Sequence, residues 1–525
     1  MRRELTKYLR LPTMSRMETG AVLSRRPAVV GGLLLILMLL TGLGWAVSSP
    51  VESSPDDNYH LGSIWCPRPA GESCQTSVVD GDPVVRVPIA VADESMRCYV
   101  LQSNKSAGCA LGYDDSHMVW SKRFDNGAYP IGYYHFHHLL VGKDVQTSVL
   151  VMRGVNVLIA VALLGTIGFC APRQLRRPFI GAIVASWVPM GVYFIASNNP
   201  SSWAVSGLMA YSAATFMAPQ QNGRRRIALV ICAVIGAVMC LTSRYDAAFF
   251  LLVVGLALLF AVPWKRGGWI GLSALAGVAL LGFGTFMASS QVSKVAYFLR
   301  VFEASDPAKS ADKQPFFEKL LVGLETAPKY LGGFWGHTWT PGWHDVPLGA
   351  RAPYVLTIMA AGAFVAVGLR RGGWRKWTAL AIIVGSMVLL PALFYANGAM
   401  DTIELYQARY IFPLLAPTFF LMLAVDQDEG AWFTVPQAVW VTVFISLCPA
   451  YAAAAIRAGC PGTVGTRPQQ AYRVVVECTG LTHDGLVPHD LLCHCGTGNR
   501  HRNADAHGRE VPGAPGFVST VGGRR

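Results

Sequence analysis

Long runs of hydrophobic residues alternate with shorter polar segments along most of this 525-residue chain. A helix needs roughly 20 mostly apolar residues to cross the hydrocarbon core of a bilayer. By that measure we predict an all-α integral membrane protein. The pattern predicts about eleven membrane-spanning helices, at residues 28–48, 149–171, 178–197, 203–219, 226–242, 246–263, 268–288, 352–370, 376–396, 409–425 and 431–454.

The polar segments differ greatly in length. Two of them, residues 49–148 and 289–351, are long enough to fold as ordered loops, whereas the other connections are short. Functional residues are often carried by loops on a rigid scaffold, so we look for candidate chemistry there. We predict a basic N-terminus over residues 1–27, a polytopic membrane domain over 28–456 and an atypical, disordered tail over 457–525.

Composition supports a membrane protein and excludes a soluble one. Apolar residues make up 52% of the chain and charged residues only 14%, against about 25% charged in ordinary soluble domains. A surface with so little charge must face lipid over most of its area, so the lipid bilayer is the first expected partner. The net charge of +13 is typical of basic cytoplasmic loops, and we expect no nucleic-acid partner.

The basic residues also predict the orientation. Those that precede the first span are Arg2, Arg3, Lys7, Arg10, Arg16, Arg25 and Arg26. By the positive-inside rule the N-terminus is then cytoplasmic, in a multi-pass protein of the plasma membrane. Every second loop should be basic, and residues 173–177, 224–226, 265–266 and 370–376 agree, whereas 426–429 is acidic. Both long loops are thereby predicted to be extracytoplasmic.

The first span has two interpretations. Its basic head and the small residues Ala46, Val47 and Ser48 at its end are also found in signal peptides. The apolar run of roughly 20 residues is longer than the usual signal core, which favours a retained membrane anchor.

Cysteines in the first long loop predict disulfide bonds. The four cysteines are Cys66, Cys74, Cys98 and Cys109. An even number of cysteines in an oxidising compartment is typical of two bridges, and three pairings are open. A zinc site is the weaker interpretation, because these spacings match no zinc module.

The chain changes character after about residue 457. The segment that follows has no lysine and no tryptophan, and it contains "CHCGTGNRHRNADAH" from Cys493 to His507. Cys493 and Cys495 are too close together for a usual chelating pair, so a disordered tail is favoured over a zinc site. A shifted reading frame relative to an ancestral gene would produce such a tail.

The first long loop opens with the acidic sequence "SSPDDNYHLGSIWC". Asp56 and Asp57 follow the end of the first span closely, so they and His60 are expected near the lipid headgroups. An adjacent acidic pair can act as a general base or hold a divalent cation. The alternative is a solvated turn, because aspartates after a proline are common in turns.

Three further charged residues lie where predicted spans meet the outer face. Arg244 and Asp246 lie in "TSRYDAAF". A charged side chain near the membrane costs free energy unless it is paired or reaches water, so both residues are functional candidates. Their mutual pairing is the structural alternative. Arg409, in "ELYQARYIFPLLAP", has a planar fork of donors that matches phosphate oxygens. For Arg409 the alternative is a side chain that snorkels to the interface.

Just before the second span, the segment "NGAYPIGYYHFHHLL" is rich in aromatic residues and histidines. His135, His137 and His138 could bind a metal ion. Aromatic residues near a span end usually form an interfacial belt, and we favour that interpretation.

Four motifs together resemble a known family. "SPDDNYHLGSIWC", "NPSSWAVSGL", "SRYDAAF" and "QARYIFPLL" occur in this order, and they resemble a domain-of-unknown-function family of bacterial polytopic membrane proteins. The resemblance covers roughly residues 28–450. That family is distantly similar to the GT-C glycosyltransferases, which have many membrane helices and an acidic motif in the first outer loop.

The resemblance implies a function and a site. GT-C enzymes transfer sugars from polyprenyl-phosphate carriers, so this chain would be a membrane glycosyltransferase acting on cell-envelope glycans. Asp56 and Asp57 would be catalytic, and the substrate-binding residues would be His60, Arg244, Asp246 and Arg409. No cofactor is implied beyond a divalent cation as an alternative. Competing hypotheses are a transporter or flippase of a lipid-linked intermediate, and a non-catalytic or degenerate membrane protein.

Overall fold

The computed structural model is mostly helical. It describes residues 27–92, 115–262, 268–289, 315–335, 373–397 and 406–424, with the isolated positions 359, 361, 362, 365, 403 and 443. The predicted spans 352–370 and 431–454 lie almost entirely outside the described residues, and the predicted tail lies wholly outside them.

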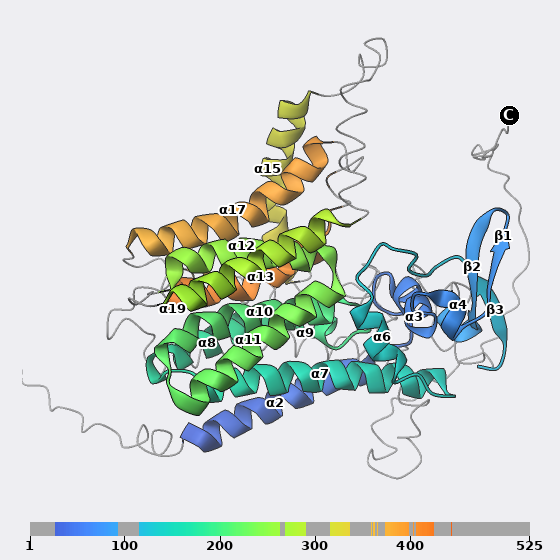
Figure 1. Ribbon diagram of the computed structural model, residues 1–525, viewed down its shortest axis with the longest axis horizontal. Helices are drawn as coiled ribbons and strands as arrows, with labels where there is room; N and C mark the ends of the chain where they lie inside the picture. The colour runs from blue at the N-terminus through green and yellow to red at the C-terminus, as the bar shows by residue number, and fades with distance from the viewer. Residues whose placement is uncertain are drawn as a thin grey trace, which may run out of the picture. The chain divides into compact units, whose positions relative to one another are not determined.

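Five described helices are long and apolar enough to cross a membrane. They are α2 (Pro27–Ser48), α7 (Val145–Cys170), α11 (Gly223–Ser243), α13 (Trp269–Met287) and α17 (Trp374–Ala396). Each coincides with a span predicted from the hydrophobic pattern. In Figure 1 the helices α2, α7 and α11 run alongside one another. That α2 is a retained anchor stays a prediction.

The predicted span at 178–197 is a broken one. It forms α8 (Arg173–Ser186) and α9 (Pro189–Ile195), which meet at an angle of 89°. Proline lacks a backbone N–H and disfavours a helical conformation in the residue before it, so Pro189 begins a new helix instead of extending α8. Counting this pair as one span raises the number of candidate spans to six. The predicted number of eleven is therefore not confirmed.

The shorter helices pack within the bundle. They include α10 (Ser201–Met217) and α12 (Tyr245–Ala261), followed late in the chain by α18 (Ala408–Ile411), η6 (Phe412–Leu414) and α19 (Leu415–Ala424). The helix α15 (Phe316–Phe334), from the second long loop, packs on α17.

The helix α10 is enclosed by protein. Every residue in it except Thr215 is buried, and it contacts α7, α9, α11 and α12. A Cβ atom on Gly207 would lie 2.8 Å from the carbonyl oxygen of Gly236 in α11, so only glycine permits this close approach of backbones. Small residues at helix contacts replace the large apolar residues that lipid-facing helices need. This explains the weak hydrophobic signal of the segment.

The first long loop contains a small antiparallel sheet that the all-α prediction did not include. Its strands β1 (Thr76–Val79), β2 (Asp82–Pro88) and β3 (Met118–Ser121) pair in this order. The turn between the first two strands has positive φ angles of 54° at Asp80 and 84° at Gly81. An Asp-Gly pair is a strong hairpin signal because both residues tolerate this conformation.

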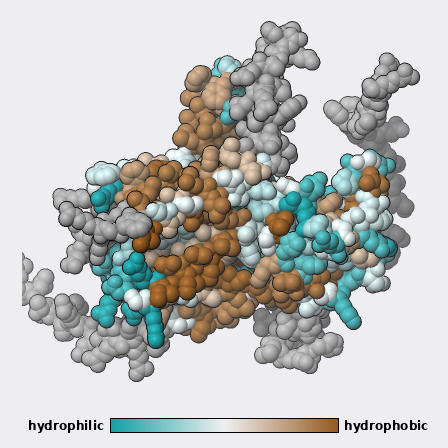
Figure 2. All heavy atoms as spheres, viewed as in Figure 1, coloured by the Kyte–Doolittle hydropathy of each residue, from teal (hydrophilic) through white to brown (hydrophobic). Residues whose placement is uncertain are grey.

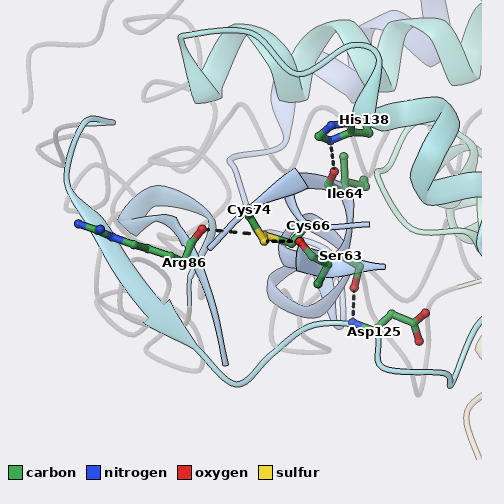
Figure 3. The surroundings of a disulfide bond; sticks show 8 residues. Ser63, Ile64, Cys66, Cys74, Arg86, Asp125 and His138 are labelled. Carbon is green, nitrogen blue, oxygen red and sulfur yellow. Dashed lines mark hydrogen bonds between the residues drawn. A yellow bond between two sulfur atoms is a disulfide. The ribbon is translucent and has the colours of Figure 1, made fainter. Parts of the chain in front are cut away.

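One of the two predicted disulfides is confirmed. Cys66, after α3 (Asp57–Trp65), is bonded to Cys74, after α4 (Ala70–Ser73). Cys98 and Cys109 lie outside the described residues. Figure 3 shows the further bonds that fix the end of α3. The backbone N–H of Asp125 donates to Ser63 Oγ over 2.8 Å, and the Nδ1 of His138, in α6 (Gly132–His138), donates to Ile64 O over 2.8 Å.

The bundle has two hydrophilic ends with apolar residues between them, as Figure 2 shows. At one end Gln221 Nε2 donates to Cys170 O over 3.0 Å. This contact brings the starts of α8 and α11, with their arginines at 173–177 and 224–226, to the same end. The first long loop joins α2 and α7 at the opposite end. The grouping agrees with the predicted alternation of basic loops, while the orientation in the membrane stays a prediction.

Candidate functional site

A buried arginine fixes the start of the first long loop. Arg153, in α7, is 1% exposed and donates to Ser49 O over 2.5 Å and to Pro50 O over 2.9 Å. Its Nη2 also lies 3.5 Å from Oδ2 of Asp57, which is fully buried. We call Arg153, Asp57 and these two carbonyl groups the buried clamp. It joins the end of α2 and the start of α3 to α7.

Asp57 is bonded within the loop as well. Its carboxylate accepts from the backbone N–H and the hydroxyl of Ser54. Burial raises the pKa of Asp57, and the opposing effects of Arg153 and Ser54 offset only part of that increase. No face of this carboxylate reaches solvent, so the structure places Asp57 in the scaffold of the loop.

Two polar side chains, one in α9 and one in the turn that follows it, hold the same backbone turn. The hydroxyl of Tyr193, in α9, donates to Ser53 O over 2.9 Å. The amide of Asn199 donates to Pro55 O over 3.1 Å. Together with the buried clamp they determine the path of the backbone into Asp56.

Asp56 faces a different environment from its neighbour. Its φ of 63° is in the left-handed region, which Asp tolerates better than most residues. Its side chain is 37% exposed. Arg409 Nη2 lies 2.6 Å from Oδ2, and Arg123 Nη2 lies 3.6 Å from Oδ1. The carboxylate is thus held between two guanidinium groups, one of them 353 residues away in the chain.

The charges around Asp56 determine its protonation. Partial burial by itself would raise the pKa of the carboxyl group, but the charge and the hydrogen bond of Arg409, together with the charge of Arg123, outweigh it. The pKa of Asp56 is therefore below its ordinary value, and the group is ionised at neutral pH.

Arg244 and Asp246 form a two-bond ion pair at the start of α12. The distances are 2.8 Å from Arg244 Nε to Oδ1 and 2.7 Å from Nη2 to Oδ2. Arg244 Nη1 also donates to Ser201 Oγ over 3.2 Å. The structure thus shows the pairing of Arg244 with Asp246 that the sequence left open. The same guanidinium lies 5.7 Å from the ring centre of Tyr129 and 5.6 Å from that of Tyr410.

Tyr410 connects this pair to Asp56, because the guanidinium of Arg409 lies 5.0 Å from the same ring. The four sequence motifs thus converge on one place. We call the charged and imidazole groups gathered there the outer cluster: Asp56, His60, Arg123, Arg244, Asp246 and Arg409. It combines three guanidinium groups with two carboxylates. Burial lowers the pKa of His60 to about 3, so the imidazole is neutral and the cluster carries one surplus positive charge.

Sequence reasoning did not select some of these residues. Arg123 lies outside every motif quoted above, whereas Tyr129 and Tyr410 lie within two of those motifs and were not singled out as site residues. Arg153 does give a signal, because an ionisable residue inside an apolar span is a functional candidate by default. Its observed role, however, is to hold the loop.

The metal alternatives find no support among the described residues. No group of three His, Cys, Asp or Glu side chains lies within reach of a common ion there. His135 donates to Arg68 O, whereas His138 donates to Ile64 O and His137 bonds to Asn156, so the three imidazoles have separate partners. The arginines beside Asp56 would also repel a divalent cation.

An apolar helix bundle with a charged cluster at the end that carries the disulfide-bonded loop defines a polytopic membrane protein. The chain belongs to the family described as "Predicted membrane protein (DUF2142)", whose model matches residues 39–418. The uncharacterised membrane family that the four motifs indicated is thereby confirmed. A search of curated proteins and of solved structures finds no match.

Proposed function

We propose that this protein is a membrane glycosyltransferase that transfers a sugar from a polyprenyl-phosphate carrier to a cell-envelope glycan. The observation that carries the proposal is the environment of Asp56. The partly exposed carboxylate lies between the guanidinium groups of Arg409 and Arg123, at the end of the bundle opposite the basic helix starts. A lipid-linked donor would place its phosphate at this level and its chain along the apolar helices.

The arginines are suited to the donor phosphate. A guanidinium fork matches phosphate oxygens with two parallel hydrogen bonds. The side chain of Arg409 is 3% exposed, and its Nε has no partner among the described residues, so it retains a donor for a further acceptor. When the bond between the sugar and the phosphate breaks, negative charge develops on the leaving phosphate. Fixed positive groups stabilise that charge most where water is excluded.

Asp56 is the candidate general base. The acceptor hydroxyl attacks the anomeric carbon, its proton passes to the Asp56 carboxylate, and the lipid phosphate leaves with the electron pair of the broken bond. A bound phosphate would compete with Asp56 for Arg409. Because the charge of Arg409 is the strongest influence holding the pKa of Asp56 down, this competition would raise the pKa and strengthen the base when donor is present.

The proposal separates the roles of the acidic pair. Asp57 is sealed inside the loop by Arg153 and Ser54, so it would act as a positioning residue for Asp56. A flippase of the same lipid would also use arginines for the phosphate, but it would not need a carboxylate base. Transfer and transbilayer movement of the lipid therefore distinguish the two functions.

The test is transfer by purified protein in liposomes that contain a panel of radiolabelled polyprenyl-phosphate sugars. Replacing Arg409 by lysine keeps the charge but loses the fork, and we expect the KM for donor to rise roughly tenfold or more. Arg86→Lys is the matched control, because Arg86 is exposed on β2 and bonds Gln75. If no donor supports transfer but the protein moves the lipid across the bilayer, the glycosyltransferase hypothesis is wrong and the flippase hypothesis is supported.

A further inference from the structure

Exposed arginines gather at the end of the bundle opposite the outer cluster. They begin α8 and α11, whose starts lie close together because Gln221 Nε2 donates to Cys170 O. Arg176 is used within the fold, since its guanidinium donates to Ala171 O and Phe169 O over 3.2 Å each. Five other arginine side chains are exposed and have no ion-pair or hydrogen-bond partner among the described residues: Arg173, Arg177, Arg224, Arg225 and Arg226. We call these five residues the arginine end.

No carboxylate offsets this charge within the part of the chain that the structure describes. The described Asp and Glu residues lie in the first long loop, at the start of α12 and in α15, and neither α8 nor α11 contains one. A cluster of one sign of charge raises the local concentration of counter-ions. The arginine end therefore presents five positive charges to an anionic partner from outside the described protein.

An apolar stripe continues from the arginines along α11. Its members recur at helical spacing and are each between 43% and 60% exposed: Ile227, Val230, Ile231, Val234, Ile235 and Val238. Arg224 lies three residues before Ile227, so it begins on the same face. The helix α8 has the same order, with Arg173 and Arg177 followed by Ile180, which is 39% exposed. Each helix thus presents a cationic head and then an apolar face, which matches an anionic lipid with its acyl chains.

The length of α11 separates the arginine end from the outer cluster. Its 21 residues extend about 32 Å at roughly 1.5 Å per residue, close to the ~30 Å thickness of the hydrocarbon core. The arginines begin the helix, whereas Ser243 ends it directly before Arg244 of the outer cluster. One lipid phosphate cannot contact both ends, so the two ends require lipids from opposite leaflets.

We propose that the arginine end binds the headgroups of anionic phospholipids in the leaflet opposite the outer cluster, with their acyl chains on the apolar stripe of α11. A guanidinium matches phosphate oxygens with two parallel hydrogen bonds. Clusters of roughly four to eight arginines or lysines beside a membrane helix are typical of anionic-lipid binding. The inference does not depend on sugar transfer, because the donor phosphate of the proposed function lies at the other end.

Lipid binding to the purified full chain tests the proposal. Native mass spectrometry in detergent micelles counts bound lipids, and the probes are phosphatidylglycerol and phosphatidylcholine with the same acyl chains. We expect the parent to prefer phosphatidylglycerol by about tenfold or more, and to lose most of this preference when the ionic strength rises from about 50 to about 500 mM. Equal affinity for the two lipids at low ionic strength would overturn the proposal.

Substitutions separate charge from folding. The triple glutamine variant, with Arg224→Gln, Arg225→Gln and Arg226→Gln, removes three of the five charges, so its affinity for phosphatidylglycerol should fall about fivefold or more. Lysine at the same three positions keeps the charge and should retain most of the affinity. Arg86→Gln is the matched control, because Arg86 is exposed on β2 in the first long loop. Unchanged affinity in the folded glutamine variant would contradict the proposal, and the ionic-strength dependence of the parent tests it without any variant.

A second lipid distinguishes the phospholipid from a polyprenyl-phosphate carrier. A short-chain polyprenyl phosphate should bind the triple glutamine variant as well as it binds the parent, because the arginines of the outer cluster are intact. If its affinity falls while that for phosphatidylglycerol is unchanged, the arginine end binds the carrier and the proposal is wrong. Preference for phosphatidylglycerol in a protein that transfers no sugar would support the arginine end and contradict the glycosyltransferase alone.

Discussion

The two halves of the acidic pair lie in opposite environments although they are adjacent in the chain. Asp57 is fully buried in the clamp with Arg153, and burial raises its pKa. Asp56 is 37% exposed in the outer cluster, and its pKa is lowered by Arg409 and Arg123 against the effect of burial. The difference shows that the surroundings of a carboxylate, and not its residue type, determine its exposure and the direction in which its pKa moves.

A single backbone conformation produces this division. The left-handed φ at Asp56 begins α3 and sends neighbouring side chains in different directions. The buried clamp then makes the direction reproducible, because it ties both sides of the turn to α7. The clamp is therefore a precondition for the short contact between Asp56 and Arg409.

Breaking the buried clamp should have the largest effect on stability. Arg153→Met leaves the carboxylate of Asp57 buried without its partner, and removal of one member of a buried ion pair costs about 3–5 kcal/mol. Chemical unfolding in detergent micelles checks this change in the free energy of unfolding. The double variant Arg153→Met with Asp57→Asn should recover part of the loss, because the unpaired charge is gone. A single variant as stable as the parent would show that the clamp does not hold the loop.

Removing the disulfide should have a smaller and local effect. The Cys66–Cys74 bridge closes a short loop with a sequence separation of 8, for which the chain-entropy estimate is about 2–3 kcal/mol. Cys66→Ser with Cys74→Ser should lose about that amount of stability in the first loop. Alkylation before and after reduction, read by mass spectrometry, should find both thiols protected in the parent. Free thiols at both positions in isolated membranes would contradict the bridge.

Weakening the outer cluster should change the pH dependence more than the stability. The pKa of Asp56 is lowered overall, against the opposing effect of burial, and Arg123 is one of the charges that lower it. Arg123→Gln should therefore raise this pKa. Since the base must be ionised, the acid limb of kcat/KM for sugar transfer should move to higher pH. The pH–rate profile of transfer measures the shift, and an acid limb that moves to lower pH would argue against Asp56 as the group that titrates.

The smallest effect is expected at an exposed ion pair in the same loop. Lys122 Nζ lies 3.0 Å from Asp82 Oδ2, and both side chains are about half exposed or more, at 49% and 62%. Exposed pairs contribute little. Asp82→Asn should leave the unfolding midpoint and the transfer rate unchanged. A large effect here would mean that any charge change in the loop impairs the protein.

The sequence predicted much of the helical framework, because lipid-facing helices must be long and apolar. It did not predict that 178–197 is bent or that α10 is enclosed by protein, since both depend on packing partners. The Asp80–Gly81 pair indicates a hairpin, but the all-α prediction did not include it. Of the site, the motifs supplied Asp56, His60, Arg244, Asp246 and Arg409. The burial of Asp57 could not be predicted, because it depends on the distant Arg153.

The most direct test of the account is the rate of sugar transfer by the Asp56→Asn variant, measured per folded molecule. Asparagine also tolerates the left-handed conformation, so the turn should survive. It cannot take a proton from the acceptor, and loss of a general base lowers rates by about 10²–10⁴. We predict that the variant folds, inserts and retains donor affinity while transfer falls by this amount, with Asp82→Asn equal to the parent. Transfer by folded Asp56→Asn at the parent rate would contradict the central claim that Asp56 is the reactive carboxylate.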